Sequence, residues 1–270
     1  MMRQHTAHSV RPAAVAGTFY PAAAAQLAQD VDAMLGNAPE VTLRGPIKAL
    51  IVPHAGYVYS GPVAATAYRA LHRQRGTITR VVLLGPCHRV AVDGMALPGV
   101  DAFETPLGVV PVDAAAVQAV TGMPGVVVSA RAHAPEHSLE VHLPFLQRAL
   151  GVFQVLPLAV GDAAPQHIAN VLEAVWGGAE TLVVISSDLS HHLPYLQART
   201  VDANTAQQVL AGSTAVTHHE ACGATPLNGL MELARRKKLH VVLLDLRNSG
   251  DTAGGKDRVV GYGSFALLEN

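Results

Sequence analysis

Short, uninterrupted runs of aliphatic residues recur along this chain, and segments with helical periodicity lie between them. Such runs fill the predicted strands at residues 48–52, 80–84 and 181–185, in which Lys48, Arg80 and Thr181 stand only at the first position. A strand that is apolar at every position is buried on both faces of its sheet, whereas a strand at the surface alternates apolar and polar residues. The pattern therefore predicts an α/β fold in which a mixed central sheet is covered by helices on both faces.

Further segments extend this prediction along the chain. Strands are expected at residues 126–129, 153–158, 239–244 and 259–267. We expect a helix capped by Ser60 with Pro62 in its first turn, and another capped by Thr225 with Pro226 at its first position. A third helix is expected over residues 139–150, either kinked at Pro144 or beginning there. No shift in composition marks a boundary, so one domain over residues 1–270 is expected.

Composition excludes several classes of protein. Half of the residues are apolar, but clean apolar runs such as 81–84 and 241–244 are far shorter than the roughly 18 residues of a membrane span. Nineteen basic and 20 acidic residues, with no basic block, argue against a nucleic-acid partner. Residues 1–8 contain no apolar segment typical of a secretory signal, and two cysteines make no disulfide framework. We therefore expect a cytoplasmic protein without a membrane partner.

Polar side chains gather where the predicted strands end. The carboxyl ends of strands are where open α/β sheets bind their ligands. The chain also has 14 histidines against 12 aromatic residues, an excess that needs a local explanation. The polar clusters occupy residues 53–57, 85–88, 136–142, 186–192, 221–223 and 248–251.

Together these clusters have the chemistry of a metal site. His54 and His88 follow two strands, and the Cys222 thiol and the pair Glu136 and His137 can reach the same rim. Imidazole, thiolate and carboxylate are all metal ligands, although a polar pocket without a metal would use the same residues. The chain has no H-E-x-x-H, no phosphate-binding G-x-x-x-x-G-K-[ST] and no G-x-S-x-G, so zincins, P-loop proteins and serine hydrolases are not favoured.

The two cysteines have different settings. Cys222 lies three residues before Thr225, so the dipole of the expected helix would favour its thiolate form. Cys87 lies beside His88 and could support a ligand, act as a ligand or fill the core. A free cysteine is often a small buried apolar residue, but Cys222 is the better candidate for a functional thiol.

Seven motifs in order give the chain a resemblance to a known family. They are Gly17-Thr18-Phe19-Tyr20-Pro21, Pro53-His54-Ala55-Gly56-Tyr57, Leu84-Gly85-Pro86 with His88, Glu136-His137-Ser138-Leu139-Glu140, Ser186-Ser187-Asp188 with His191, Cys222-Gly223, and Asn248-Ser249-Gly250-Asp251. The chain resembles the Memo family, whose bacterial and archaeal members are also called AmmeMemoRadiSam system protein B. The resemblance extends over residues 10–267.

The resemblance implies a fold like that of class III extradiol non-haem iron dioxygenases. His54 and His88 match the two histidine ligands of those enzymes, and Cys222 matches the position where Memo proteins offer a thiol to iron or copper. His191 matches a pocket histidine that acts as acid or base, with Asp188 beside it. The dioxygenases complete their site with a carboxylate, whereas the softer Cys222 suits copper or a redox role.

Two functions follow from this resemblance. One is a metal-dependent redox enzyme, such as an oxygenase, with an Fe(II) or copper ion on His54, His88 and Cys222 and with His191 as general base. The other is a binding or signalling protein whose pocket receives a peptide or a small ligand without turnover. The family's name further implies a radical-SAM protein and an AMMECR-type protein as partners.

Two details of the pocket can be predicted. If Glu136 and Glu140 share one face of a helix near His142, Glu136 could orient a pocket histidine, although a capping role is equally compatible. Asp188 could hold one nitrogen of His191 and leave the other as a base. The alternative makes His191 a fourth ligand of the metal.

Overall fold

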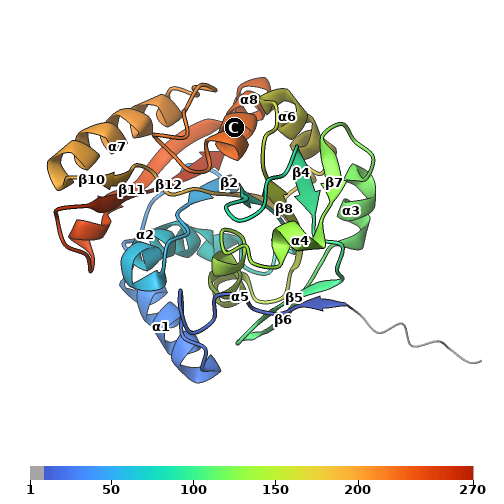
Figure 1. Ribbon diagram of the computed structural model, residues 1–270, viewed down its shortest axis with the longest axis horizontal. Coiled ribbons are helices and arrows are strands. Elements are labelled where there is room, and N and C mark those ends of the chain that lie inside the picture. The colour runs from blue at the N-terminus through green and yellow to red at the C-terminus, as the bar shows by residue number, and fades with distance from the viewer. Residues whose placement is uncertain (1–8, 270) are drawn as a thin grey trace, which may run out of the picture.

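The protein, described here by a computed structural model over residues 9–269, has a mixed β-sheet between two layers of helices. Figure 1 shows α1, α2 and α5 on one side of the sheet and α6, α7 and α8 on the other. This arrangement confirms the predicted α/β fold with a mixed sheet covered on both faces. Residues 1–8, on which the argument about a secretory signal depends, lie outside the described residues, and the single domain over residues 1–270 stays a prediction.

The central sheet has nine strands in the order β10-β12-β2-β9-β3-β8-β4-β7, and β11 pairs with β12 outside this path. Its centre, from β2 through β9 and β3 to β8, is parallel, while β12 and β4 join it in the antiparallel sense. A second sheet has the order β1-β5-β6. The strands are β1 (Val10–Arg11), β2 (Ile47–Val52), β3 (Arg80–Pro86), β4 (Met95–Leu97), β5 (Ala102–Thr105), β6 (Gly108–Pro111), β7 (Val126–Val128), β8 (Gln154–Val160), β9 (Thr181–Ser186), β10 (His191–Leu193), β11 (His240–Asn248) and β12 (Val259–Leu268).

Two apolar cores lie between the sheet and its helices. One contains Leu50 and Val52 with side chains of α1, α2 and α5, and the other contains Ile51 with side chains of α3, α6, α7 and α8. Successive residues of one strand thus enter opposite cores, as the uninterrupted apolar runs require. The helices are α1 (Ala24–Asn37), α2 (Tyr57–Arg69), α3 (Ala114–Val120), α4 (Ala130–His133), α5 (Leu143–Leu150), α6 (Pro165–Ala174), α7 (Tyr195–Leu210) and α8 (Ala224–Lys237), with 3-10 turns η1 (Ala70–Gln74), η2 (Glu140–His142) and η3 (Ser249–Asp251).

The predicted helix starts are wrong at two places. The helix α2 begins at Tyr57 rather than after Ser60, because the Ser60 hydroxyl donates to the Ala55 carbonyl (2.8 Å) instead of capping. The helix α8 begins at Ala224, and the Thr225 hydroxyl lies 3.1 Å from His218 Nε2. Of the two predictions for residues 139–150, the helix that begins at Pro144 is the better one, since α5 has this proline in its first turn.

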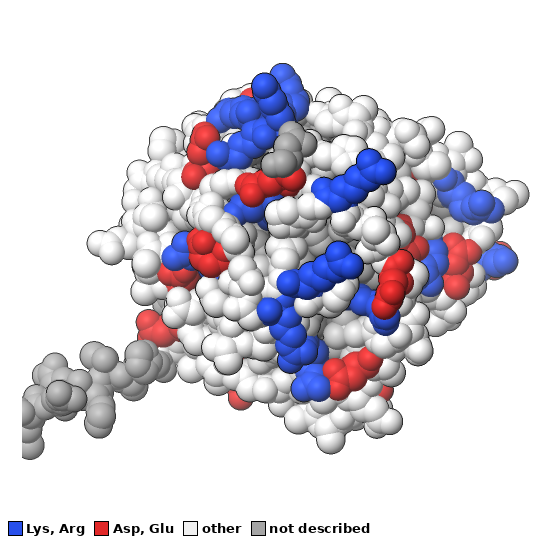
Figure 2. Space-filling model, turned by 180° about the vertical axis from the view of Figure 1, so that it is seen from behind, with Lys and Arg blue, Asp and Glu red and all other residues white. Residues whose placement is uncertain are grey.

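Charged residues lie in small groups on the face seen in Figure 2. Several groups combine Lys or Arg with Asp or Glu, and wide uncharged areas separate them. On this face the described residues form no continuous basic surface of the kind that binds a nucleic-acid backbone. No helix within residues 9–269 is long and apolar enough to span a membrane.

Candidate metal centre

His54 follows the buried strand β2 and is itself 2% exposed. Its Nδ1 atom lies 2.6 Å from the Ser186 hydroxyl at the end of β9, and that hydroxyl donates to the Ser138 carbonyl (2.6 Å). A hydroxyl has one proton to donate, so Ser186 accepts from His54 Nδ1–H. This chain of hydrogen bonds leaves the Nε2 atom of His54 without a proton, so that its lone pair can bind a metal ion.

His88 follows β3 and is held by a buried carboxylate. Glu136, which is 1% exposed, accepts from the backbone N–H of His88 (2.5 Å) and lies 2.9 Å from His88 Nδ1. The rings of His54 and His88 lie 5.2 Å apart, edge to face. Since Glu136 binds Nδ1–H, the Nε2 atom of His88 keeps its lone pair for a ligand.

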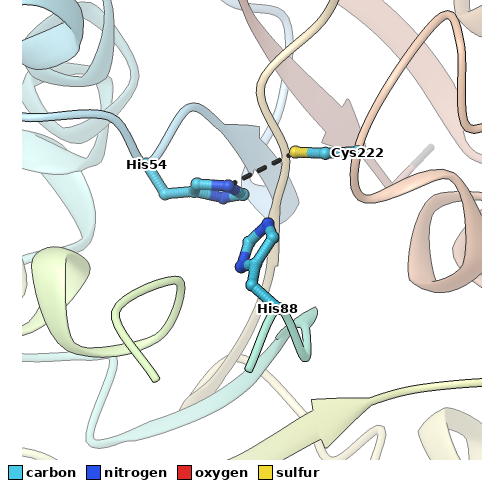
Figure 3. A group of neighbouring side chains, drawn as sticks. All are labelled: His54, His88 and Cys222. Atoms are coloured by element: carbon cyan, nitrogen blue, oxygen red, sulfur yellow. Dashed lines mark hydrogen bonds between the residues drawn. The ribbon is translucent and has the colours of Figure 1, made fainter. Parts of the chain in front are cut away.

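Cys222 lies in the turn before α8 and completes the group. Its Sγ atom is 3.3 Å from His54 Nε2, and its backbone N–H donates to the Asp188 carbonyl (3.2 Å). The ligand atoms of His54, His88 and Cys222 all lie within 4.8 Å of one another, and Figure 3 shows the three side chains converging from three separate segments. Two imidazole nitrogens and one sulfur at this spacing could hold one metal ion.

The protonation states of the group can be assigned in part. Burial, together with the neighbouring imidazoles, lowers the pKa of His54 well below its usual range, so the ring is neutral and able to coordinate. Burial and then the nearby Asp188 raise the pKa of the Cys222 thiol. The expected helix dipole therefore does not make Cys222 a thiolate in the metal-free protein; a bound cation would have to displace the proton.

His137 adds a third imidazole beside the first two. Its ring stacks on His88 at 4.7 Å and lies 5.5 Å from that of His54. His137, His88 and Glu136 form a second group of possible ligands. Burial lowers the pKa of His137 to about 4. Burial alone would raise the pKa of Glu136, but hydrogen bonds from His88 and from the Ser138 backbone lower it to about 2. Glu136 is thus an anion that orients His88.

The predicted helical relation between Glu136 and Glu140 is wrong. Glu136 lies in the turn between α4 and η2, where it accepts from the backbone of His137 and Ser138. Glu140 pairs instead with Arg11 (2.6 Å). The imidazole of His142 is buried and its Nδ1 lies 2.8 Å from the Tyr68 hydroxyl. A one-turn 3-10 helix at 140–142 replaces the expected α-helix, because Pro144 sets where α5 begins.

Asp188 contacts His54 rather than His191. Its Oδ1 atom accepts from the backbone N–H of His54 (2.7 Å), and its Oδ2 atom is 4.0 Å from His54 Nε2. Burial raises the pKa of Asp188 to about 7, and hydrogen bonds from the backbone of His54 and Ala55 only partly offset this effect. The prediction that Asp188 holds a ring nitrogen of His191 is therefore wrong.

His191 is oriented by a carbonyl group instead. Its Nδ1 atom lies 2.8 Å from the Leu189 carbonyl, which can only accept, so Nδ1 carries the proton and Nε2 is free. Burial of the ring, with lesser effects of His192 and His88, lowers the pKa of His191. His192 follows with a positive φ of 61°, a rare conformation for a residue with a side chain.

Cys87 lies outside the group of three. Its Sγ atom is 3.8 Å from the Ala132 carbonyl, and the side chain packs against the core on the α2 side of the sheet. Ser186 and Ser138, by contrast, support the site through His54, although we assigned them no role from the sequence. The position of Ser186 at the end of β9, in register with Val52 at the end of β2, is the signal that could have indicated it.

The fold and the site together define an α/β protein with a possible His-His-Cys metal centre at the carboxyl edge of its sheet. A family profile described as "Memo-like protein" matches residues 11–266. The chain belongs to the Memo family.

Individual relatives agree with this assignment. A MEMO1 family protein of Aquifex aeolicus (strain VF5) is 35% identical over 273 residues, which cover 96% of this chain and 99% of the relative. One from Metallosphaera sedula is 35% identical over 277 residues, covering 93% and 97%. The crystal structure of the uncharacterized protein JW3007 from Escherichia coli K12 has a TM-score of 0.52 at 13% identity, with 81% of this chain and 99% of that chain covered. At this identity the likeness extends to the fold alone.

Proposed function

We propose that this chain is a metal-dependent redox protein in which His54, His88 and Cys222 hold one iron or copper ion. The observation that supports this proposal best is the pair of imidazoles whose Nδ1 atoms are hydrogen-bonded to Ser186 and Glu136, next to a thiol 3.3 Å from His54 Nε2. Two oriented imidazoles and a soft sulfur suit a redox metal, and a thiolate favours copper.

The bound ion would supply one-electron chemistry and a positive charge for a ligand. The protein's own groups would supply orientation and proton transfer. Glu136 would fix the ring of His88, and Asp188 would fix the backbone of His54. His191, neutral and with its Nε2 atom free, would accept a proton from the substrate as a general base.

Metal analysis of protein purified without oxygen tests the proposal. We expect close to one iron or copper ion per chain in the wild type, and a loss of most of it in His54→Ala and Cys222→Ser. His72→Ala removes an exposed histidine outside the site and is the matched control. Oxygen uptake with a panel of catechols then tests turnover. Equal metal content in all four proteins would contradict the proposed ligands.

A groove beside the site favours a second function, the binding of a peptide or a small ligand without turnover. It has a volume of about 610 Å³ and is lined by residues that include Phe19, Tyr57 and Tyr59. The Phe19 ring lies 4.7 Å from that of His137, so the groove adjoins the pocket. Stoichiometric metal without oxygen uptake would favour this function. Co-purification with a radical-SAM or an AMMECR-type protein would test the partners that the family's name implies.

A further inference from the structure

Tyr262 on β12 lies directly beside Asp188. Beyond the end of β2, the segment after β9 takes its place next to β12: Leu189 N–H donates to the Gly261 carbonyl and Gly261 N–H donates to the Ser190 carbonyl, both at 2.8 Å. Leu189 faces the α7 side of the sheet, because its Cδ1 atom lies 3.1 Å from where a Cβ of Gly263 would be. Side chains alternate along extended segments, so Asp188 and Tyr262 both face the α2 side, where His54 lies.

The hydroxyl of Tyr262 differs from those of the other buried tyrosines. Tyr20 donates to Glu140 (2.6 Å), Tyr57 donates to the Val141 carbonyl (2.6 Å), and Tyr68 lies 2.8 Å from His142 Nδ1. Tyr262 is only 1% exposed, yet within residues 9–269 its hydroxyl has no hydrogen-bond partner. Nor is it among the polar atoms sealed from solvent, so the small exposed area includes the hydroxyl.

A buried phenol normally finds a partner, because an unpaired hydroxyl loses the hydrogen bonds that water would give it. Burial raises the pKa of Tyr262, and the nearby Asp188 and Tyr59 raise it further, so the phenol keeps its proton and is a donor. A donor held in a strand on the same side of the sheet as His54, with a small exposed area and no protein acceptor within residues 9–269, is suited to an acceptor that arrives with a ligand.

We propose that the Tyr262 hydroxyl donates a hydrogen bond to a small ligand that binds on the open side of the metal centre through an oxygen or nitrogen lone pair. This role rests on the proposed function, since the metal would hold the ligand and Tyr262 would set its orientation. Tyr262 is thus a binding residue for the ligand and has no part in holding the metal. Its donor would select ligands that have an acceptor atom next to the coordinating atom, and would discriminate against apolar ones.

The test uses cobalt(II), which does not change its oxidation state on a thiolate, and azide as the ligand probe. Wild type, Tyr262→Phe and Tyr195→Phe are loaded with cobalt and titrated with azide while the visible absorption of cobalt is followed. Tyr195→Phe also loses one hydroxyl, which in the wild type donates to Asp251 outside the site. We expect Tyr262→Phe to bind cobalt as the wild type does and to raise the Kd for azide about tenfold, the loss typical of a hydrogen bond to a charged group.

Thermal unfolding separates a structural role from this one. Because the hydroxyl has no protein partner, we expect Tyr262→Phe to leave the Tm of the cobalt-free protein within about 2 °C of the wild type. A lower Tm together with an unchanged Kd for azide would assign a structural role and overturn the inference. If Tyr262→Phe changes neither the Kd for azide nor the Tm, the inference about Tyr262 is overturned and the proposed metal site stands. A cobalt-loaded wild type that binds no azide has the same consequence. A wild type that binds no cobalt overturns the proposed metal site and this inference together.

Discussion

Two buried polar clusters share the segment 136–142, and they differ in how completely their hydrogen bonds are satisfied. Glu140, which is fully buried, accepts from Arg11, from the Tyr20 hydroxyl and from the backbone of Ala14 and Val15. In the candidate metal centre, the protein holds the Nδ1 atom of each imidazole, and the Nε2 atoms point inward: His54 Nε2 lies 3.3 Å from the Cys222 thiol, and His88 Nε2 has no hydrogen-bond partner within residues 9–269. The first cluster holds the chain together, and the second keeps lone pairs for a ligand.

The first prediction tests whether the Glu140 cluster stabilises the fold. A small effect of removing its positive charge would contradict the comparison between the two clusters. In Arg11→Met the carboxylate of Glu140 stays buried without its positive partner, and we expect the free energy of unfolding to fall by about 3–5 kcal/mol in urea denaturation. The exposed pair of Arg148 and Asp32 provides the control, since Arg148→Met should cost less than about 1 kcal/mol. Similar losses in both variants would show that Glu140 tolerates burial without Arg11.

The second prediction concerns the pH dependence of stability at His133, whose carbonyl accepts from Arg11 Nε. Burial lowers the pKa of His133 to about 4, whereas an unfolded histidine titrates near 6.5. The unfolded chain therefore takes up the proton first as the pH falls. The stability contributed by the neutral ring is complete above pH 6.5 and is lost between pH 6.5 and 4, a decrease of about 3 kcal/mol.

His133→Gln isolates this effect from that of the other buried histidines. Its amide N–H can replace His133 Nε2, which lies 2.6 Å from the Ala96 carbonyl, but it does not titrate. Unfolding free energies measured at pH 7.5 and at pH 4.5 should differ less in the variant than in the wild type, by an amount on the order of 2–3 kcal/mol. Equal differences in the two proteins would mean that His133 gains its proton without loss of structure.

The third prediction sharpens the contrast at the metal centre. Glu136→Gln keeps the shape of the side chain but removes the charge and one acceptor, so the ring of His88 is no longer fixed by a carboxylate. We expect metal affinity to fall by about 10- to 100-fold, as for other groups that orient a metal-binding histidine. Competition with a chelator measures the affinity, and Glu104→Gln on the surface strand β5 is the control. A change of less than about twofold would assign Glu136 a purely structural role.

The sequence predicts the central sheet because burial between two layers of helices requires apolar residues along each strand, and such runs are visible in the sequence. After the polar first residues Lys48, Arg80 and Thr181, the runs at 48–52, 80–84 and 181–185 are apolar at every position, since each lies between two helical layers. The sheet of β1, β5 and β6 follows from no such pattern: β1 has two residues, and β6 exposes Val109 while it buries Val110. Short strands at a surface have too few contacts to leave a period in the sequence.

Some features of the candidate metal centre can likewise be predicted from the sequence, and others cannot. His54 and His88 directly follow strands of the parallel centre, so their meeting at one edge could be predicted from strand order alone. The hydrogen-bond partner of Asp188 could not be predicted from the sequence. It depends on the turn after β2, which brings the backbone N–H of His54 within 2.7 Å of Asp188 Oδ1. Likewise Glu136 orients His88 from a turn, and no helical period indicates where its carboxylate points.

The last prediction has the smallest expected effect on the metal and tests how far the group of ligands extends. His191 lies beyond the three side chains whose ligand atoms are within 4.8 Å of one another, and its Nδ1 proton is engaged by the Leu189 carbonyl. In His191→Ala we therefore expect the metal content and the affinity to stay within about twofold of the wild type. Turnover that needs a base should fall by about 10²- to 10⁴-fold. His192→Ala, which alters the next imidazole, also exposed, is the matched control. If metal binding in His191→Ala is lost as fully as in His54→Ala, His191 is a fourth ligand. Its Nε2 atom then belongs with the inward-facing ligand atoms that distinguish the metal centre from the Glu140 cluster.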